Sequence, residues 1–182
     1  MAETTSEAAN AVMMDHLVTL TYHEVLPPEG IRFAEALLDG RILGQKCTAC
    51  GRVYVPPKGY CPLDVVLLSE DDDVVVSDQG IVTGFTIVAP VKYYGQTKTE
   101  PFVYASVLLD GASGTLGGQD IAIPPDEVRA GLRVRAVWKP VEERNTEGMS
   151  ARGYASVSGC VSSFEPTGEP DAPPEAYQEH VI

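Results

Sequence analysis

The chain has 182 residues, of which 44% are hydrophobic and 21% are charged, and its formal net charge is -13. These proportions are typical of a globular protein with one medium-sized or two small domains. No apolar run approaches the ~20 residues of a membrane-spanning helix, and the acidic start MAETTSEAAN lacks the features of a signal peptide. Nucleic-acid affinity depends mainly on neutralising phosphates with Lys and Arg, so an acidic chain is a poor nucleic-acid binder by default. Because the sequence shows neither a long apolar run nor the features of a signal peptide, we expect a cytoplasmic protein with no membrane segment.

Residues 1–29 are predicted to form an N-terminal extension. A weak apolar stripe there favours either a frayed terminus or a segment that docks on a partner; it consists of Met13, Met14 and Leu17. A helix signal follows, because Pro27 and Pro28 suit a helix start and Gly40 suits a stop. Four apolar residues recur at helical spacing and are expected to share the buried face: Ile31, Ala34, Leu37 and Leu38.

The next segment, CTACGRVYVPPKGYCPLD, has the spacing of a metal-binding ribbon. A C-x2-C pair lets one tight turn present two thiolates to one ion, and the usual glycine, Gly51, follows the first pair. The second pair is represented by Cys61 and, three residues later, Asp64. We therefore expect two knuckles and a metal site with the ligands Cys47, Cys50, Cys61 and Asp64.

The residue at position 64 leaves alternatives open. A carboxylate ligates zinc, so Asp64 or a water molecule is expected to complete a structural site weaker than one of four thiolates. The competing interpretation is a ribbon that folds without metal. A catalytic zinc is disfavoured, because no His or Glu follows nearby to act as a base.

The remaining sequence is predicted to be β-structure. Five segments rich in β-branched and aromatic residues are separated by Gly and Pro: 80–90, 101–111, 119–124, 132–140 and 152–164. In the fourth, Leu132, Val134, Ala136 and Trp138 alternate with Arg133 and Arg135. With one helical turn expected at 124–131, the pattern suits a five-stranded OB-fold barrel. The Pro-rich acidic tail is expected to be disordered or to be an arm ordered by a partner.

No self-contained active site is evident in the sequence. The three histidines, His16, His23 and His180, lie in or near the terminal segments, and Cys160 is expected to be a small buried apolar residue. The glycine-rich run at 111–118 lacks the Lys-Ser/Thr ending of a phosphate-binding loop and is predicted to be a flexible loop. Tyr93 and Tyr94 are expected either to stack on a ligand or to pack on the mouth of the barrel.

The order of these segments resembles a known family. A helix leads through GRILGQKCTACGRVYVPPKGYCP into GIVTGFTIVAP, PFVYASVLLDG and VRAGLRVRAVW, which is similar to a rubredoxin-like zinc ribbon fused to an OB-fold, long catalogued as a domain of unknown function. The resemblance covers residues 30–165. Together with the residue patterns above, it predicts a mainly β chain with an N-terminal helix, a zinc-ribbon knuckle, a five-stranded OB-fold barrel and an extended C-terminal tail. The expected divisions are 1–29, 30–72 (helix and ribbon), 73–165 (OB-fold) and 166–182 (tail).

The resemblance also carries functional expectations. Members of the family look like partners of thiolase-superfamily enzymes, including steroid side-chain aldolases, so it implies a non-catalytic subunit that helps form the acyl-CoA path, within a heterotetramer. Structural zinc is implied, although Asp64 stands where the family usually has Cys. The anionic phosphates of CoA are expected to meet a basic stretch, unless this is only a solvated strand face; the residues are Arg129, Arg133, Arg135 and Lys139. The alternatives are an OB-fold nucleic-acid module and a free-standing metal enzyme.

Overall fold

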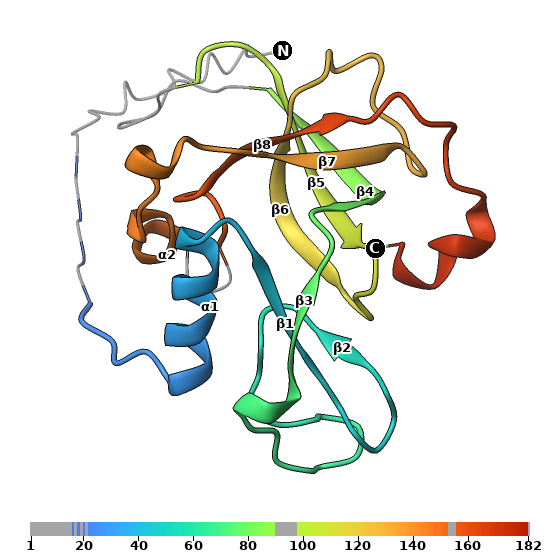
Figure 1. Cartoon of the computed structure of the whole chain (residues 1–182). Coiled ribbons are helices and arrows are strands. Elements are labelled where there is room, and N and C mark those ends of the chain that lie inside the picture. Colours follow the sequence, from blue (N-terminus) through green and yellow to red (C-terminus); the bar gives the residue numbers. More distant parts are fainter. Residues whose placement is uncertain are drawn as a thin grey trace, which may run out of the picture.

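The computed structural model describes residues 16, 18, 20, 22–89, 98–152 and 156–181. The apolar stripe at Met13, Met14 and Leu17 and the pair Tyr93 and Tyr94 lie outside these residues. The chain forms two successive parts. A helix and a three-stranded ribbon come first, and a closed barrel comes second (Figure 1).

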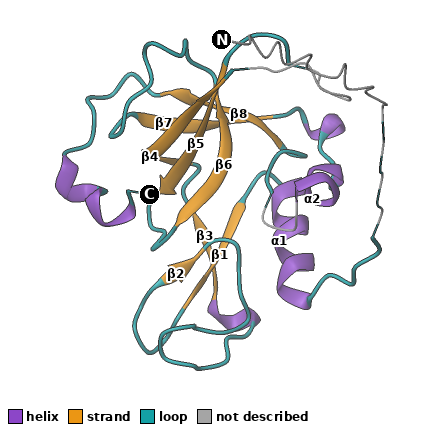
Figure 2. Cartoon of the chain, turned by 180° about the vertical axis from the view of Figure 1, so that it is seen from behind, coloured by secondary structure: helices purple, strands orange, loops and turns teal. Residues whose placement is uncertain are grey.

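The ribbon sheet has the strand order β2-β1-β3 and is antiparallel throughout. It is preceded by the helix α1, whose range is Pro28–Leu38; the strands are β1 (Ile42–Lys46), β2 (Val53–Tyr54) and β3 (Asp73–Val76). The helix begins with Pro at its first turn and ends before Gly40, which has a φ of 78°, so the predicted start and stop are confirmed. Figures 1 and 2 place α1 beside β1, and the ribbon projects away from the barrel.

The predicted buried face of α1 is only partly correct. Ala34 and Leu37 are buried, but Ile31 is 46% exposed and Leu38 is 36% exposed. Phe33 and Ala36 are buried in their place. The large Phe33 ring therefore fixes the helix rotation, because it fills the space where the helix, the ribbon and the barrel share one apolar core.

The barrel is closed by five strands in the order β4-β5-β6-β8-β7, which confirms the expected OB-type architecture. Its elements are β4 (Gln79–Val88), β5 (Phe102–Leu109), β6 (Thr115–Ile121), β7 (Arg133–Trp138), α2 (Glu147–Arg152) and β8 (Val161–Pro166). Closure is completed by a parallel bridge between Ile121 and Phe164. The predicted alternation in β7 is confirmed, since Val134 and Ala136 are buried whereas Arg135 is exposed.

Three local predictions differ from the structure. β6 already begins at Thr115, so the glycine-rich segment is partly strand rather than only a loop. The segment 124–131 contains a hydrogen-bonded turn, with Glu127 N–H donating to Pro124 O, and the helix lies instead between β7 and β8. The segment 152–164 holds the end of α2 before β8 starts at Val161. Local pattern alone does not fix where a strand begins, because the partner strand decides which residues can pair.

The C-terminal tail is ordered against the barrel, contrary to the expectation of disorder or of order only with a partner. Thr167 N–H donates to Arg133 O at 3.0 Å, and Ala172 N–H donates to Gly131 O at 2.8 Å. The tail then forms two single 3-10 turns, Pro174–Ala176 and Gln178–His180. Both views show these turns on the side of the molecule opposite α1 (Figure 2). None of the helices in the described part of the chain has the length and apolar character needed to cross a bilayer.

Candidate metal centre

The first knuckle follows directly from β1. Cys47 N–H donates to Arg52 O and Gly51 N–H donates to Cys47 O, both at 2.8 Å, which closes the turn that carries Cys50. Gly51 has a φ of 74°, a left-handed conformation that glycine adopts without steric cost. Cys47 is fully buried, whereas Cys50 is exposed.

The second knuckle repeats this backbone. Val65 N–H donates to Cys61 O at 2.9 Å, and Cys61 N–H donates to Val66 O at 2.8 Å. Asp64 stands at the position equivalent to Cys50, and Val65 stands at the position equivalent to Gly51. Val65 has a φ of 56°, the single left-handed non-glycine residue in the described part of the chain. Cys61 is fully buried and Asp64 is exposed, so each knuckle contributes one buried and one exposed donor.

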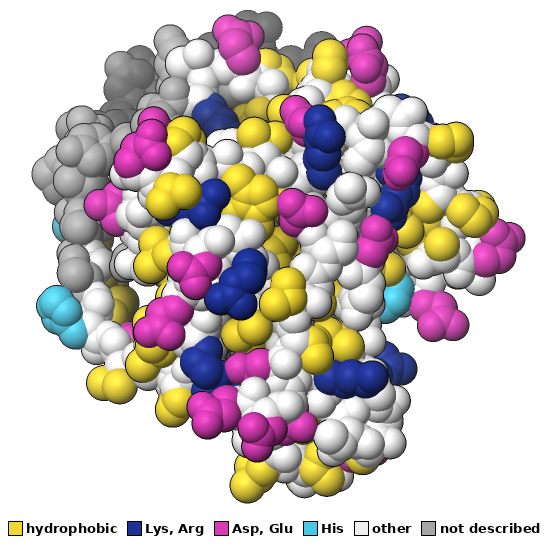
Figure 3. Space-filling view, in the orientation of Figure 1, with side chains coloured by type: hydrophobic (Ala, Val, Ile, Leu, Met, Phe, Trp, Pro, Cys, Tyr) yellow, Lys and Arg dark blue, Asp and Glu magenta, His cyan; other side chains and the backbone are white. Residues whose placement is uncertain are grey.

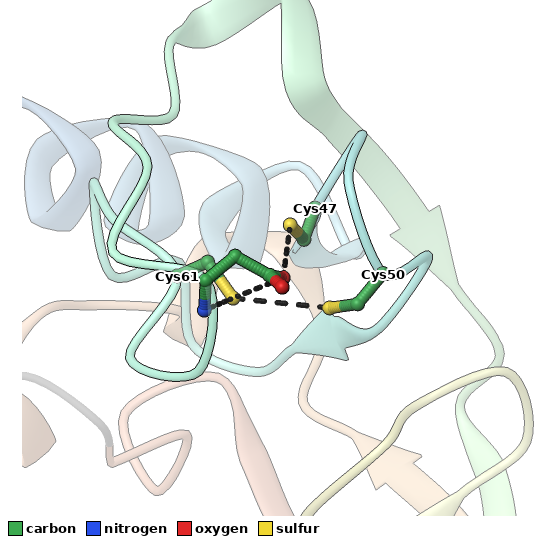
Figure 4. Close-up of side chains that lie close together, drawn as sticks. Cys47, Cys50 and Cys61 are labelled. Atoms are coloured by element: carbon green, nitrogen blue, oxygen red, sulfur yellow. Dashed lines mark hydrogen bonds between the residues drawn. The ribbon is translucent and has the colours of Figure 1, made fainter.

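The four predicted ligands meet at one point between the knuckles. Their donor atoms all lie within 4.8 Å of one another. The Sγ atoms of Cys50 and Cys61 are 3.8 Å apart (Figure 4). Asp64 Oδ2 lies 3.3 Å from Cys47 Sγ and 3.2 Å from Cys61 Sγ. A tetrahedron with Zn–S bonds of ~2.3 Å has its sulfurs ~3.8 Å apart. The three thiolates and one carboxylate therefore fit zinc, as the sequence predicted, and they would hold it as a structural ion that clamps the two knuckles together.

Hydrogen bonds within the cluster shift the protonation of the ligands. Asp64 accepts from the thiols, which raises the pKa of Cys50 to about 12 and lowers the pKa of Asp64. For Cys61, burial acts to raise the pKa, but the hydrogen bond from Tyr54 and bonds from backbone N–H groups outweigh it, so the net pKa is lowered. Zinc binding must displace the remaining thiol protons, and its apparent affinity is expected to increase with pH.

Two side chains that the sequence did not single out support the site. Tyr54 Oη lies 3.2 Å from Cys61 Sγ, and this contact raises the pKa of Tyr54 to about 12, which keeps the phenol protonated as a donor to the sulfur. Gln45 is fully buried in β1. No sequence pattern marked Gln45, which the structure places among the four buried residues at the start of β1.

Gln45 ties the second knuckle to β1 through four hydrogen bonds. Its Oε1 accepts from Lys58 N–H at 3.2 Å and from Gly59 N–H at 2.8 Å. Its Nε2 donates to Ser69 O at 2.9 Å and to Asp73 Oδ1 at 3.2 Å. The amide thus satisfies backbone groups before and after the knuckle, and so it fixes the loop that carries Cys61 and Asp64.

The predicted basic residues lie elsewhere, on and beside β7, and three of them are engaged by carboxylates. Arg129 forms a bidentate ion pair with Asp171 (Nη2–Oδ1 2.8 Å), Arg133 pairs with both Asp110 (2.6 Å) and Glu169 (3.3 Å), and Arg135 pairs with Glu165 (2.8 Å). Lys139 forms no ion pair with the residues that the structure describes. An anion that binds any of these three arginines would have to displace the carboxylate that already pairs with it.

The other candidate residues are not gathered into a site. Cys160 is 2% exposed and its Sγ lies 3.5 Å from Asn145 O, and burial raises the pKa of its thiol. His16 and His23 are exposed in the N-terminal segment. His180 reaches the first knuckle, where it lines a shallow hollow of about 360 Å³ together with Cys50 and Arg52.

Sequence comparison agrees with this architecture. A family model described as the ChsH2 rubredoxin-like zinc ribbon domain matches residues 34–63, and a model of the ChsH2 C-terminal OB-fold domain matches residues 73–139. Together they cover more than half of the chain. The chain belongs to the ChsH2 (DUF35) family. Asp64 lies one residue beyond the ribbon match.

Relatives within the DUF35 family cover most of the same region. A DUF35 domain-containing scaffold protein from Methanocaldococcus jannaschii is 29% identical over 115 residues, which span 62% of this chain and 78% of the relative. A scaffold protein of the same description from Methanothermobacter thermautotrophicus is 26% identical over 115 residues, covering 62% of this chain and 83% of the relative.

Solved structures show the same DUF35 fold. A protein of unknown function from the DUF35 family of Sulfolobus solfataricus aligns with a TM-score of 0.51 and 25% identity, over 60% of this chain and 78% of that chain. A chain of the Ltp2-ChsH2(DUF35) aldolase aligns with a TM-score of 0.54 and 19% identity, over 79% of this chain and 98% of that chain. At 19% identity this second match shows the fold alone.

Proposed function

We propose that the chain is a non-catalytic partner subunit of a thiolase-superfamily acyl-CoA enzyme, either a steroid side-chain aldolase or a thiolase. The observation that carries this proposal is the ribbon-and-barrel match over 98% of a chain from an aldolase complex, together with relatives that are named scaffold proteins. The metal centre supports it, because three thiolates and a carboxylate suit a structural ion and clamp a surface rather than activate a substrate. The catalytic residues then belong to the partner.

The acyl-CoA part of the proposal rests on the basic residues beside β7. A phosphate can bind Lys139 without displacing a carboxylate of the described residues. To bind Arg129, Arg133 or Arg135, it must displace the carboxylate that pairs with that arginine. We therefore propose that CoA, bound mainly by the partner, touches this edge of the barrel. We also propose that the protein is located in the cytoplasm.

Co-expression with a thiolase-superfamily enzyme from the same organism tests the partnership. The expected result is one stable complex by size-exclusion chromatography with light scattering, with the mass of a heterotetramer containing two copies of each chain. A chain that stays monomeric and leaves that enzyme's mass, stability and turnover unchanged would overturn the proposal.

The alternative, an OB-fold that binds nucleic acid, predicts a different result. Its affinity would come from free cations, yet the net charge is -13 and the arginines of β7 are neutralised by carboxylates. We expect no binding of fluorescent single-stranded DNA at micromolar protein and low salt. Tight, salt-sensitive binding would replace the proposed function with this one.

A further inference from the structure

The second knuckle and the segment after it expose a cluster of apolar side chains. We call the cluster the apolar tip, and it consists of Tyr60 (51% exposed), Leu63 (62%), Val65 (85%) and Leu67 (89%). Figure 3 shows hydrophobic side chains at the end of the molecule where the ribbon loops lie, next to acidic ones. Four large apolar residues exposed within eight positions differ from scattered surface hydrophobics and are typical of an interaction site.

Val65 is held in a conformation that its side chain disfavours. A φ of 56° is the left-handed region, where a β-branched residue is an outlier, and the equivalent position of the first knuckle is Gly51. The side chain of Val65 is 85% exposed, so burial within this chain does not offset the backbone strain. The knuckle requires the left-handed backbone at this position but does not require a valine, so the exposed valine side chain indicates a functional constraint.

The apolar tip is also rigid. Leu68 N–H donates to Gly59 O at 2.9 Å, Tyr60 and Leu67 form an antiparallel bridge, and Gln45 holds the backbone at Gly59. Association therefore requires little ordering of the loop, which makes the exposed apolar area more effective in binding.

The surroundings of the apolar tip indicate the chemistry of its partner. The 3-10 turn Glu70–Asp72 adjoins Leu67, and none of its carboxylates forms an ion pair with Lys or Arg among the described residues. A hollow of about 610 Å³ beside Tyr60 and Leu67 is lined by Glu29 and Glu70 and by the cations Lys58 and Arg32. Arg32 is neutralised by Asp73, so carboxylates predominate around the apolar tip. Carboxylates beside an apolar centre match a protein surface with an apolar depression and a basic rim, and they repel nucleic acid and anionic lipid.

We propose that the apolar tip inserts into an apolar depression, bordered by Lys or Arg, on the catalytic subunit. This inference rests on the proposed function, since the occupant is that subunit. It adds that Val65 and Leu67 lie at the centre of the contact and that the acidic turn lies at its edge, where it contributes mainly to the association rate.

The test measures how tightly zinc-loaded variants of the full chain bind the thiolase-superfamily subunit that forms a complex with the unaltered chain. Val65→Asn introduces a residue that adopts the left-handed conformation more readily and removes the apolar side chain. Leu67→Gln changes the apolar tip without touching a knuckle. Val141→Asn is the matched control at a valine outside the ribbon that is also largely exposed (71%, against 85% for Val65). We expect Kd to increase at least tenfold for the first two variants and less than twofold for the control, with zinc content and Tm unchanged or, for Val65→Asn, a higher Tm.

The outcomes separate this inference from the proposed function. If the unaltered chain does not bind the subunit, both are overturned. If the unaltered chain binds and both tip variants bind equally well, the inference is wrong and the partnership stands. If instead the unaltered chain self-associates and the tip variants are monomeric, a second copy is the occupant and the assignment to the catalytic subunit is wrong.

Discussion

The two knuckles have the same backbone but different side chains, and they face different surroundings. Each closes with one hydrogen bond of 2.8 to 2.9 Å from the residue after the second ligand to the first cysteine, and each places that residue at positive φ. The first knuckle supplies two thiols and a glycine and lies beside the tail, near His180. The second supplies one thiol, a carboxylate and a strained valine at an exposed apolar surface. The backbone turn therefore sets the metal geometry, and the side chains around it are free to set affinity and recognition.

Loss of a buried ligand should abolish zinc binding, to which both knuckles contribute. Cys47→Ser removes a fully buried donor, and we expect zinc content to fall below about 0.1 equivalent per chain, because a structural site needs its four ligands. Elemental analysis of protein prepared without chelators measures this. Thr48→Ala in the same turn is the matched control and should retain one equivalent. Full zinc in Cys47→Ser would show that the knuckles hold no metal through this residue.

Substitutions at position 64 should change the affinity for zinc in opposite directions. Asp64→Cys makes the second knuckle chemically equal to the first, and we expect zinc to bind at least tenfold more tightly, since a thiolate is the softer donor. Asp64→Ala should weaken binding by about tenfold or more. Competition with a chromophoric chelator at constant pH gives both values. Identical affinities for the aspartate and alanine forms would mean that a water, not Asp64, is the fourth ligand.

The smallest effects are expected from exchanging the left-handed residues. Gly51→Val places in the first knuckle the residue that the second one carries, and because a Cβ there meets no atom within 4 Å, the cost is conformational only, about 1–2 kcal/mol. Val65→Gly should stabilise by about 1 kcal/mol or less, after the greater entropy of an unfolded glycine is subtracted. Chemical denaturation of the zinc-loaded protein measures both. A stabilising Gly51→Val would contradict the interpretation that Val65 is strained.

The sequence predicted those parts of the molecule that depend on local spacing. The C-x2-C and C-x2-D spacings, the helix limits at Pro28 and Gly40, and the alternation in β7 are set by neighbouring residues, and the structure confirms them. The buried rotation of α1 was partly wrong, because Phe33 is placed by a core shared with segments far along the chain.

Other features depend on long-range contacts and left no pattern in the sequence. The tail is ordered by bonds such as Arg129–Asp171, which joins residues 42 positions apart, so its composition alone indicated disorder. The support from Gln45 and Tyr54 was likewise missed, because a glutamine and a tyrosine near a knuckle have many other uses. The strain at Val65 could not be recognised until its φ was known, since valine gives no sequence signal for a left-handed turn.

The apolar packing of the metal centre is separate from the main core. Cys47, Cys61 and Leu68 form a small cluster with Tyr54 and Val66, whereas β1, β3 and α1 contribute to the core of the barrel. The end of the ribbon can therefore melt on its own while the barrel stays folded, which would appear in hydrogen exchange as two units with different protection. Zinc supply would then control assembly: a cell short of zinc would hold a pool of chains that are folded enough to persist but that lack the shaped surface needed to recruit a partner.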